Sequence, residues 1–268
     1  MTELSEFDIE MTLDPPGRIA VIGAGPLGLE AALYGRFLGY DVTVFECGEV
    51  GQTLRLCPDE PLPMLPSDCL SALARSAIET QRGGIGALVG PVTIGQWLRD
   101  AIEPLANTDL LRGRVLTGHR VLAIEPVEVL LDDDAVGTSD GDYEIDEDIP
   151  PDFRIWFEGV ASVTDADSAL ADEGGDSRQA AEFEAVIVAI GARDISSVTG
   201  LGGCLESPYC FRVGGSATSV APSPAGETSL SEESAAARRL AEGRGAIVKI
   251  FAGLGGRAGL DLYRPLRL

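Results

Sequence analysis

The stretch RIAVIGAGPLGLEAALYGRFLGYDVTVFE, residues Arg18–Glu46, combines an apolar run, three spaced glycines, a helix-like segment, a second apolar run and an acid. It predicts a buried strand over Ile19–Ile22, a helix over Pro26–Leu38 that Gly39 ends, and a second, parallel strand over Val42–Phe45. We therefore predict an α/β fold built on a Rossmann-like parallel sheet.

The three glycines stand directly after the first predicted strand and at the start of the predicted helix. Gly23 allows a tight turn, Gly25 lets backbone N–H groups approach a pyrophosphate, and Gly28 lets the helix pack closely on the strand. The positive end of the helix dipole attracts phosphate. The predicted pyrophosphate loop consists of Gly23, Ala24, Gly25, Pro26, Leu27 and Gly28.

Glu46 ends the second predicted strand about twenty residues beyond the glycines, where an acceptor for ribose hydroxyls is expected. A carboxylate at this place repels a 2′-phosphate, so NADP is disfavoured as the ligand of this loop. FAD and NAD both remain open, because the glycine loop alone does not separate them.

The chain has 268 residues, of which 45% are hydrophobic, so it can bury a large core. We expect a flexible leader over 1–17 and a single domain over 18–268. No window approaches eighteen unbroken apolar residues and the acidic start lacks the features of a signal peptide, so we expect a cytoplasmic protein. The net charge of −23 argues against nucleic-acid and membrane binding and leaves small molecules or proteins as partners.

Cysteine and histidine are sparse in this sequence. The five cysteines form no C-x-x-C pair, and no metal site is expected. Cys204 and Cys210 could pair, but two free thiols are expected in a reducing cytoplasm. His119 is the only histidine, so a catalytic triad is excluded unless His119 belongs to it.

Between the second strand and the acidic part of the chain, we predict a loop, two helices and then strands. The proline-rich stretch Gly51–Asp68 is expected to be an irregular loop lying over a site. Helices are predicted over Ser67–Arg75, with Ser67 as N-cap, and over Thr93–Leu105. Residues Arg114–Leu131 alternate as strands of a small antiparallel layer would.

Two acidic insertions, about 132–152 and 164–180, are expected to be solvated loops on either side of a short strand, RIWFEGV. Order returns with the strand segments AVIVAIGARD, Ala185–Asp194, and YCFRVGGSA, Tyr209–Ala217.

In the tail, we predict a helix over Ser231–Glu242, capped by Ser229 or Ser231, and then an apolar strand or helix over Ile247–Leu254. The glycines of Gly253–Gly259 are expected to form a loop, because no helix, strand and acid follow them.

AVIVAIGARD resembles the segment in which flavoproteins with two dinucleotide-binding domains return a strand beside the glycine loop. That superfamily includes flavin-containing monooxygenases and thioredoxin-reductase-like enzymes. GQTLR resembles the stretch that passes near the flavin, the residues leading to Val121 resemble the adenine-side segment, YCFRVGGSA the final FAD segment, and GRAGLDLYRPL the carboxyl end of some bacterial members. The resemblance implies FAD as cofactor and adds Gly51, Gln52, Thr53, Val121, Gly191, Gly214 and Gly215 to the candidate cofactor-binding residues.

The sequence departs from that superfamily in two places. The final FAD segment usually reads Gly-Asp, whereas Gly214 is followed here by Gly215 and Ser216. Only residues 192–213 lie where a nicotinamide domain would be inserted, which is too short for a domain. A hydride donor must then be NAD(P)H that binds freely at the flavin, unless electrons come from a redox partner protein or from the substrate.

The favoured function is an FAD-binding oxidoreductase, monooxygenase-like, acting on a small molecule. Its catalytic candidates are Cys57, as a thiol that exchanges with flavin, and His119, as a proton shuttle. The simpler interpretations are that Cys57 is an incidental thiol and that His119 is a structural residue of a strand. Two alternatives stay open. One is a degenerate, non-catalytic nucleotide-binding protein that acts through partners, and the other is an NAD-dependent dehydrogenase with His119 as its acid–base group.

Overall fold

A five-stranded parallel sheet with the order β3-β2-β1-β7-β8 forms the centre of the molecule. The computed structural model describes residues 12–81, 93–127, 152–160, 178–191, 198–214 and 229–264. The strands are β1 (Arg18–Ile22), β2 (Asp41–Phe45), β3 (Val115–Leu116), β7 (Ala185–Val188) and β8 (Cys210–Arg212). The strands β2 and β3 are added on one side of β1, and β7 and β8 are then added on its other side. This order is that of a doubly wound dinucleotide-binding sheet. The predicted fold class is confirmed.

The first βαβ unit forms as the sequence predicts. Helix α1 (Pro26–Phe37) starts with proline at its first position, where the missing N–H costs nothing. Gly39, at φ +97°, allows the left-handed residue that ends the helix. Strand β1 is buried from Ile19 to Ile22 because it lies between β2 and β7.

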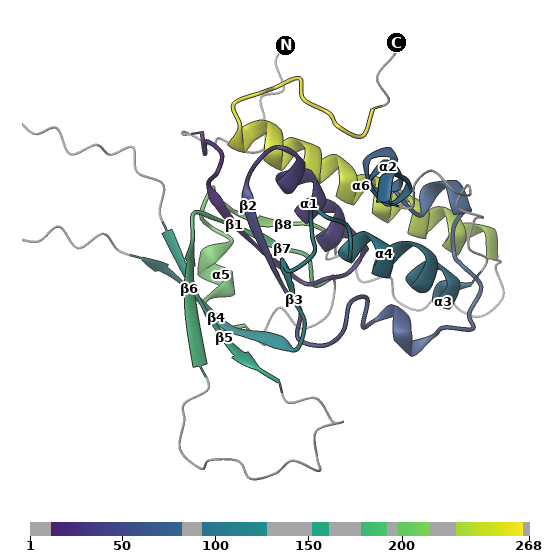
Figure 1. The fold of residues 1–268 in the computed structure, drawn as a ribbon, viewed down its shortest axis with the longest axis horizontal. Coiled ribbons are helices and arrows are strands. Elements are labelled where there is room, and N and C mark those ends of the chain that lie inside the picture. Colours follow the sequence, from purple (N-terminus) through teal and green to yellow (C-terminus); the bar gives the residue numbers. More distant parts are fainter. Residues whose placement is uncertain are drawn as a thin grey trace, which may run out of the picture.

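The helices and a second sheet cover opposite sides of the parallel sheet. Figure 1 shows α1, α2 (Ala72–Gln81) and α6 (Ser229–Leu254) on one side and strands β4 to β6 on the other. On the helical side, Phe251 stacks on Tyr34 with ring centroids 5.2 Å apart. On the other side, Phe45 contacts Phe157 at 4.9 Å between ring centroids.

The second sheet is antiparallel, with the order β4-β5-β6. It consists of β4 (His119–Val127), β5 (Asp152–Gly159) and β6 (Arg178–Phe183). Thr199, ahead of the short helix α5 (Leu201–Cys204), exchanges backbone hydrogen bonds with β4 by donating to the Leu122 carbonyl and accepting from the Ile124 N–H. The segment between β7 and β8 therefore ties the two sheets together.

Two strand predictions need correction. The expected antiparallel strands over Arg114–Leu131 divide between the sheets, because β3 pairs in parallel with β2 and only β4 joins the antiparallel layer. The acidic insertions are shorter than expected, since Asp152 opens β5 and Arg178 opens β6. The rest of both insertions lies outside the described residues.

Helix α2 (Ala72–Gln81) begins at Ala72 and not at Ser67 as predicted, so Ser67 is not its cap. Residues Pro66–Asp68 form a separate 3-10 turn, η2. The Ser71 hydroxyl accepts the Ala74 N–H at 3.0 Å and so caps α2. Ser71 takes this role because its own N–H and hydroxyl are bound by a buried carboxylate, that of Glu30.

The predicted helix over Thr93–Leu105 exists, but it is interrupted. Thr93 caps α3 (Ile94–Trp97) by accepting the Gln96 N–H, a π-helical stretch η3 (Leu98–Ile102) follows, and α4 (Glu103–Ala106) completes it. Pro104 has no N–H and its ring would clash with the carbonyl four residues earlier in a regular helix, so the wider turn precedes it.

The tail forms one continuous helix. Residues Ile247–Leu254 belong to α6, so the alternative of a strand there is wrong, and the expected loop over Gly253–Gly259 begins only after Leu254. Two glycines, Gly243 and Gly245, do not break α6 because the helix is held along α1 by packing. The side chains that would cap α6 lie outside the described residues.

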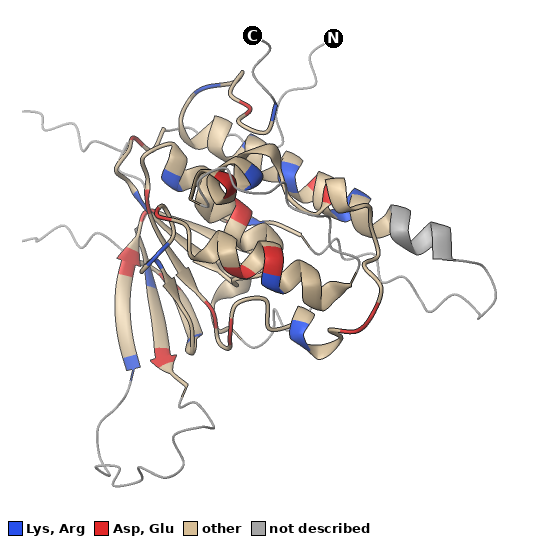
Figure 2. Cartoon of the chain, turned by 45° about the vertical axis from the view of Figure 1, so that its right-hand side comes forward, with Lys and Arg blue, Asp and Glu red and all other residues tan. Residues whose placement is uncertain are grey.

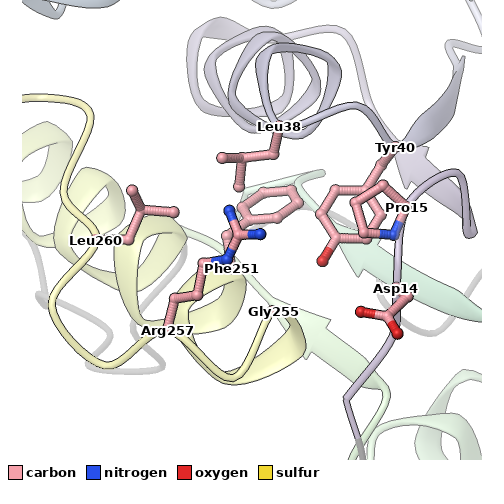
Figure 3. A pocket seen from close by; sticks show the side chains of 8 residues that line it. All are labelled: Asp14, Pro15, Leu38, Tyr40, Phe251, Gly255, Arg257 and Leu260. Carbon is pink, nitrogen blue, oxygen red and sulfur yellow. The ribbon is translucent and has the colours of Figure 1, made fainter.

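The expected leader is packed against the fold from Leu13 onward. Leu13 is buried, its N–H donates to the Leu254 carbonyl at 2.7 Å, and its carbonyl accepts the Tyr40 hydroxyl at 2.8 Å. Figure 3 shows the small pocket that results between the leader, the end of α1 and the turn after α6; Asp14, Pro15, Leu38, Tyr40, Phe251, Gly255, Arg257 and Leu260 line it.

Cys204 and Cys210 form a disulfide between α5 and β8, with Cα atoms 5.7 Å apart, so the expectation of two free thiols is wrong. The pair is buried beside the sheet. Cys47, Cys57 and Cys69 are free.

Charges of both signs are interspersed along the helices of the described part of the chain (Figure 2). Within that part, no helix is long and apolar enough to cross a membrane, and no cluster of His, Cys, Asp or Glu is arranged to hold a metal ion. Residues 132–151 alone contain nine acidic and no basic side chains, so much of the negative charge belongs to sequence outside the described residues.

The free energy of unfolding should fall at alkaline pH because of Tyr263, which lies in the segment after α6. Burial raises the pKa of Tyr263 well above its usual value, and the Glu30 charge raises it further. The folded protein keeps this proton where the unfolded chain releases it, so the stabilisation is complete below about pH 10 and is lost as the pH rises. Urea unfolding at about pH 8 and about pH 11 should show this loss, and Tyr263→Phe should reduce it; an equal alkaline loss in both proteins would contradict the assignment.

Candidate dinucleotide site

Two of the three loop glycines are required by close backbone contacts. A Cβ on Gly23, at φ +105°, would lie 2.8 Å from the Ala189 carbonyl oxygen. A Cβ on Gly28 would lie 1.9 Å from the Gly23 carbonyl oxygen. The first turn of α1 therefore lies directly on the turn after β1, and both lie on the end of β7.

Gly25 is different, because neither its conformation nor its surroundings exclude a side chain. Its φ is −79°, and a Cβ there would meet nothing within 4 Å. The open space lies at the start of α1, where first-turn N–H groups have no acceptor within the helix. Pro26 brings no N–H, so the amides of Leu27 and Gly28 are the ones available to a ligand. This arrangement suits an anion such as a pyrophosphate.

Glu46 lies beside this loop, as the sequence predicts. Its carboxylate is 8% exposed; one oxygen accepts the Ala24 N–H at 2.8 Å and the other accepts the Gly48 N–H at 3.0 Å. An ionised carboxylate has about four acceptor positions, so the oxygen that accepts the Ala24 N–H can accept a further hydrogen bond. The group can thus receive a ribose hydroxyl while it remains held by the backbone.

The residues after β2 continue along the loop. Gly51, at φ +65°, donates its N–H to the Ala24 carbonyl at 3.0 Å, and a Cβ there would lie 2.5 Å from Leu98. Gln52 and Thr53 are exposed, and the Gln52 side chain accepts the Glu49 N–H. The structure therefore places Gly51 against the glycine loop, with the other two candidates on the adjoining surface.

The start of β4 lies next to Glu46. The His119 N–H donates to the Glu46 carbonyl at 2.8 Å, and Val121, two residues further, is buried. The His119 Nδ1 is 2.7 Å from the Thr117 carbonyl, which only accepts, so Nδ1 carries the proton and Nε2 is left as the nitrogen that can exchange one.

Two further candidates come from the late strands. Gly214, at φ +74°, lies against Leu27, because a Cβ there would be 2.9 Å from the Leu27 Cδ1. Gly191, at φ +71°, follows β7, and its carbonyl accepts a hydrogen bond from Arg212 at 3.3 Å. Gly215 and Ser216 lie outside the described residues.

Cys57 is half-buried at the end of the 3-10 turn η1 (Leu54–Leu56). The next carbonyl, of Pro58, accepts the Gly95 N–H at 2.8 Å, so this loop is seated on the start of α3. Within the described part of the chain, none of the hydrogen bonds found joins Cys57 to the glycine loop.

Cys47 belongs to the site, although its role was not predicted. Its thiol donates to a Glu46 carboxylate oxygen at 3.5 Å. Burial raises the pKa of Cys47, and the adjacent Glu46 carboxylate raises it further. The sequence signal that could have indicated this role is that Cys47 directly follows Glu46, the candidate for ribose binding.

No family model and no curated protein matches this sequence. Among solved structures, OTEMO in complex with FAD and NADP matches with a TM-score of 0.42 and 18% identity over 67% of this chain and 26% of that chain. S-allyl-L-cysteine S-oxygenase from Allium sativum matches with a TM-score of 0.40 and 16% identity over 65% of this chain and 36% of that chain. Bacillithiol disulfide reductase Bdr from Bacillus cereus matches with a TM-score of 0.37 and 18% identity over 65% and 40%, respectively.

The chain thus matches only about a quarter to two fifths of the length of these proteins. Similarity of this extent assigns no activity.

The loop glycines should respond differently to alanine. Gly28→Ala should lower the free energy of unfolding by about 3 kcal/mol or more, because its methyl group would meet the Gly23 carbonyl. Gly25→Ala should change it by less than about 1 kcal/mol, since its methyl group enters open space. Denaturant unfolding measures both, with Gly202→Ala as a control at another glycine that has open surroundings. Similar losses for Gly25 and Gly28 would disprove the described loop geometry.

Removing the Glu46 charge should activate the neighbouring thiol. Glu46→Gln should speed alkylation of Cys47 by iodoacetamide by roughly two- to tenfold at fixed neutral pH, because each unit of pKa changes the thiolate fraction about tenfold. Peptide mass spectrometry separates Cys47 from Cys57, whose rate serves as the control. An unchanged Cys47 rate would show that its thiol does not sense the carboxylate.

Proposed function

We propose that this protein binds FAD at the glycine loop and acts as an FAD-dependent oxidoreductase on a small molecule, with monooxygenation as the favoured chemistry. The observation that carries the proposal is the open space at Gly25 beside the Glu46 carboxylate, which is 2.8 Å from the Ala24 N–H. An anion-binding helix start next to a ribose acceptor fits the adenosine and pyrophosphate parts of a dinucleotide.

The later strands favour FAD over NAD. Gly214 contacts the glycine loop through Leu27, as expected for a segment that closes over the middle of a long cofactor. In the proposed complex, the Leu27 and Gly28 amides hold the pyrophosphate, Glu46 holds the adenosine ribose, and the backbone near Gly51, Val121 and Gly191 lies along the rest. Bound FAD would supply the redox chemistry, while the protein supplies binding and orientation.

The alternatives keep specific support. A non-catalytic nucleotide-binding protein is favoured by Gly215 at the position where aspartate is usual in the resembled superfamily. An NAD-dependent dehydrogenase would need an acid–base group. His119 could supply one only through its Nε2, because its Nδ1 is bound to the Thr117 carbonyl. We propose that electrons come from freely binding NAD(P)H or from a redox partner protein, and that the protein acts in the cytoplasm.

The absorption spectrum of the purified protein tests the proposal. We expect flavin bands at about 370 and 450 nm, with FAD identified by mass after release. Gly25→Val should abolish binding because its side chain fills the space for the pyrophosphate, and Glu46→Ala should weaken it by roughly 30-fold, the equivalent of about 2 kcal/mol for hydrogen bonds to a charged group.

Gly202→Ala is the matched control and should retain the flavin. A colourless protein that takes up no added FAD would overturn the proposal. Uptake of NAD with loss of NADH oxidation in His119→Ala would favour the dehydrogenase, and a specific protein partner without flavin would favour the non-catalytic alternative.

A further inference from the structure

A buried carboxylate on α1 joins three segments that are far apart in the sequence. Glu30 is 2% exposed, and its carboxylate accepts the Ser71 N–H at 2.8 Å, the Ser71 hydroxyl, and an Arg244 guanidinium N–H at 3.2 Å. Ser71 caps α2, and Arg244 lies on α6. One side chain thus connects the helix of the glycine loop with both of its neighbours.

The Arg244 guanidinium is not placed for the greatest stability. Its Nη1 donates to the Asp68 carbonyl at 2.9 Å and its Nη2 to Glu30, but its buried Nε has no hydrogen-bond partner. A buried ion pair of this kind repays little of its desolvation cost, and its best-attested use is to fix the register of packed elements.

This ion pair fixes how α6 is aligned along α1, and the effect of this alignment extends to the glycine loop. Gly243, the residue before Arg244, lies against Leu27, since a Cβ there would be 2.4 Å from the Leu27 Cδ1. Gly214, which follows β8, lies against the same Leu27 methyl group. Elsewhere, the α1–α6 interface is aromatic and aliphatic, as at Tyr34 and Phe251, and such contacts alone specify register weakly.

We propose that the Glu30–Arg244 pair is a positioning device for the dinucleotide site. By fixing α6 along α1, it seats Gly243 on Leu27 and so holds the first turn of α1 in the conformation that receives the pyrophosphate. The inference rests on the proposed function for its ligand, but the positioning itself is a property of the ligand-free protein.

Three variants separate positioning from stability. Arg244→Met leaves the buried carboxylate without its countercharge and should lower Tm most, and Glu30→Gln should lower it less. The double variant removes the ion pair while the amide oxygen introduced by Glu30→Gln still accepts from Ser71, so it should recover most of the Tm lost by Arg244→Met. Arg238→Met is the control, because Arg238 pairs with Glu242 on the exposed side of the same helix.

We expect all three variants, the double variant included, to bind FAD about tenfold more weakly than the wild type, with Arg238→Met unchanged. A merely structural pair would let affinity recover together with Tm in the double variant, and that result would overturn the proposal. Wild-type affinity in all variants would overturn it as well.

Hydrogen exchange distinguishes this inference from the proposed function. The Leu29 N–H, bound to the Gly25 carbonyl at 3.0 Å, reports on the first turn of α1 without any cofactor. Positioning predicts faster exchange at Leu29 in the double variant than in the wild type under conditions of equal global stability. If the wild type binds no FAD, the proposed function fails, and faster exchange still supports the positioning role, whereas equal exchange refutes it.

Discussion

The contact between Gly28 and the carbonyl of Gly23 is the constraint on which the rest of this structure depends. Because no side chain separates them, α1 starts directly on the turn after β1, and the Ala189 end of β7 closes on the same place. The helix start, the open space at Gly25 and the amides that face it are consequences of that approach. The packing of α6 along α1 then extends the arrangement to Gly243, which lies against Leu27.

Carboxylates bound by backbone N–H groups complete this arrangement. Glu46 joins the turn after β1 to the turn after β2, and Glu30 joins α1 to the start of α2. In a protein of net charge −23, both are buried where main-chain donors compensate for the loss of water. The two acids differ in one respect: Glu30 has an arginine partner within the protein, whereas Glu46 keeps an acceptor position beside an open space.

The parts of the fold that the sequence predicts are those set by neighbouring residues. The β1–α1–β2 unit, its glycines and Glu46 follow from periodicity and spacing within thirty residues. The errors arise where a distant contact decides. Ser71 displaces Ser67 as a cap because Glu30 binds it, and α6 continues through Gly243 because α1 supports it. The disulfide has another reason, since Cys204 and Cys210 are close in sequence and the bond was rejected on the assumption of a reducing compartment. The pair of Glu30 and Arg244 had no local signal, since 214 residues separate its members.

The central position of β1 also has a consequence for how this chain is made. Its neighbour β2 follows almost at once, but β7, on its other side, begins at Ala185, and α6, which covers α1, begins at Ser229. During synthesis, β1 therefore has one unpaired edge until β7 has left the ribosome, and α1 has one uncovered face until α6 has done so. Such dependence on late, non-local pairing slows folding and favours assistance by chaperones. The glycine loop is therefore translated well before the strand and the helix that complete it.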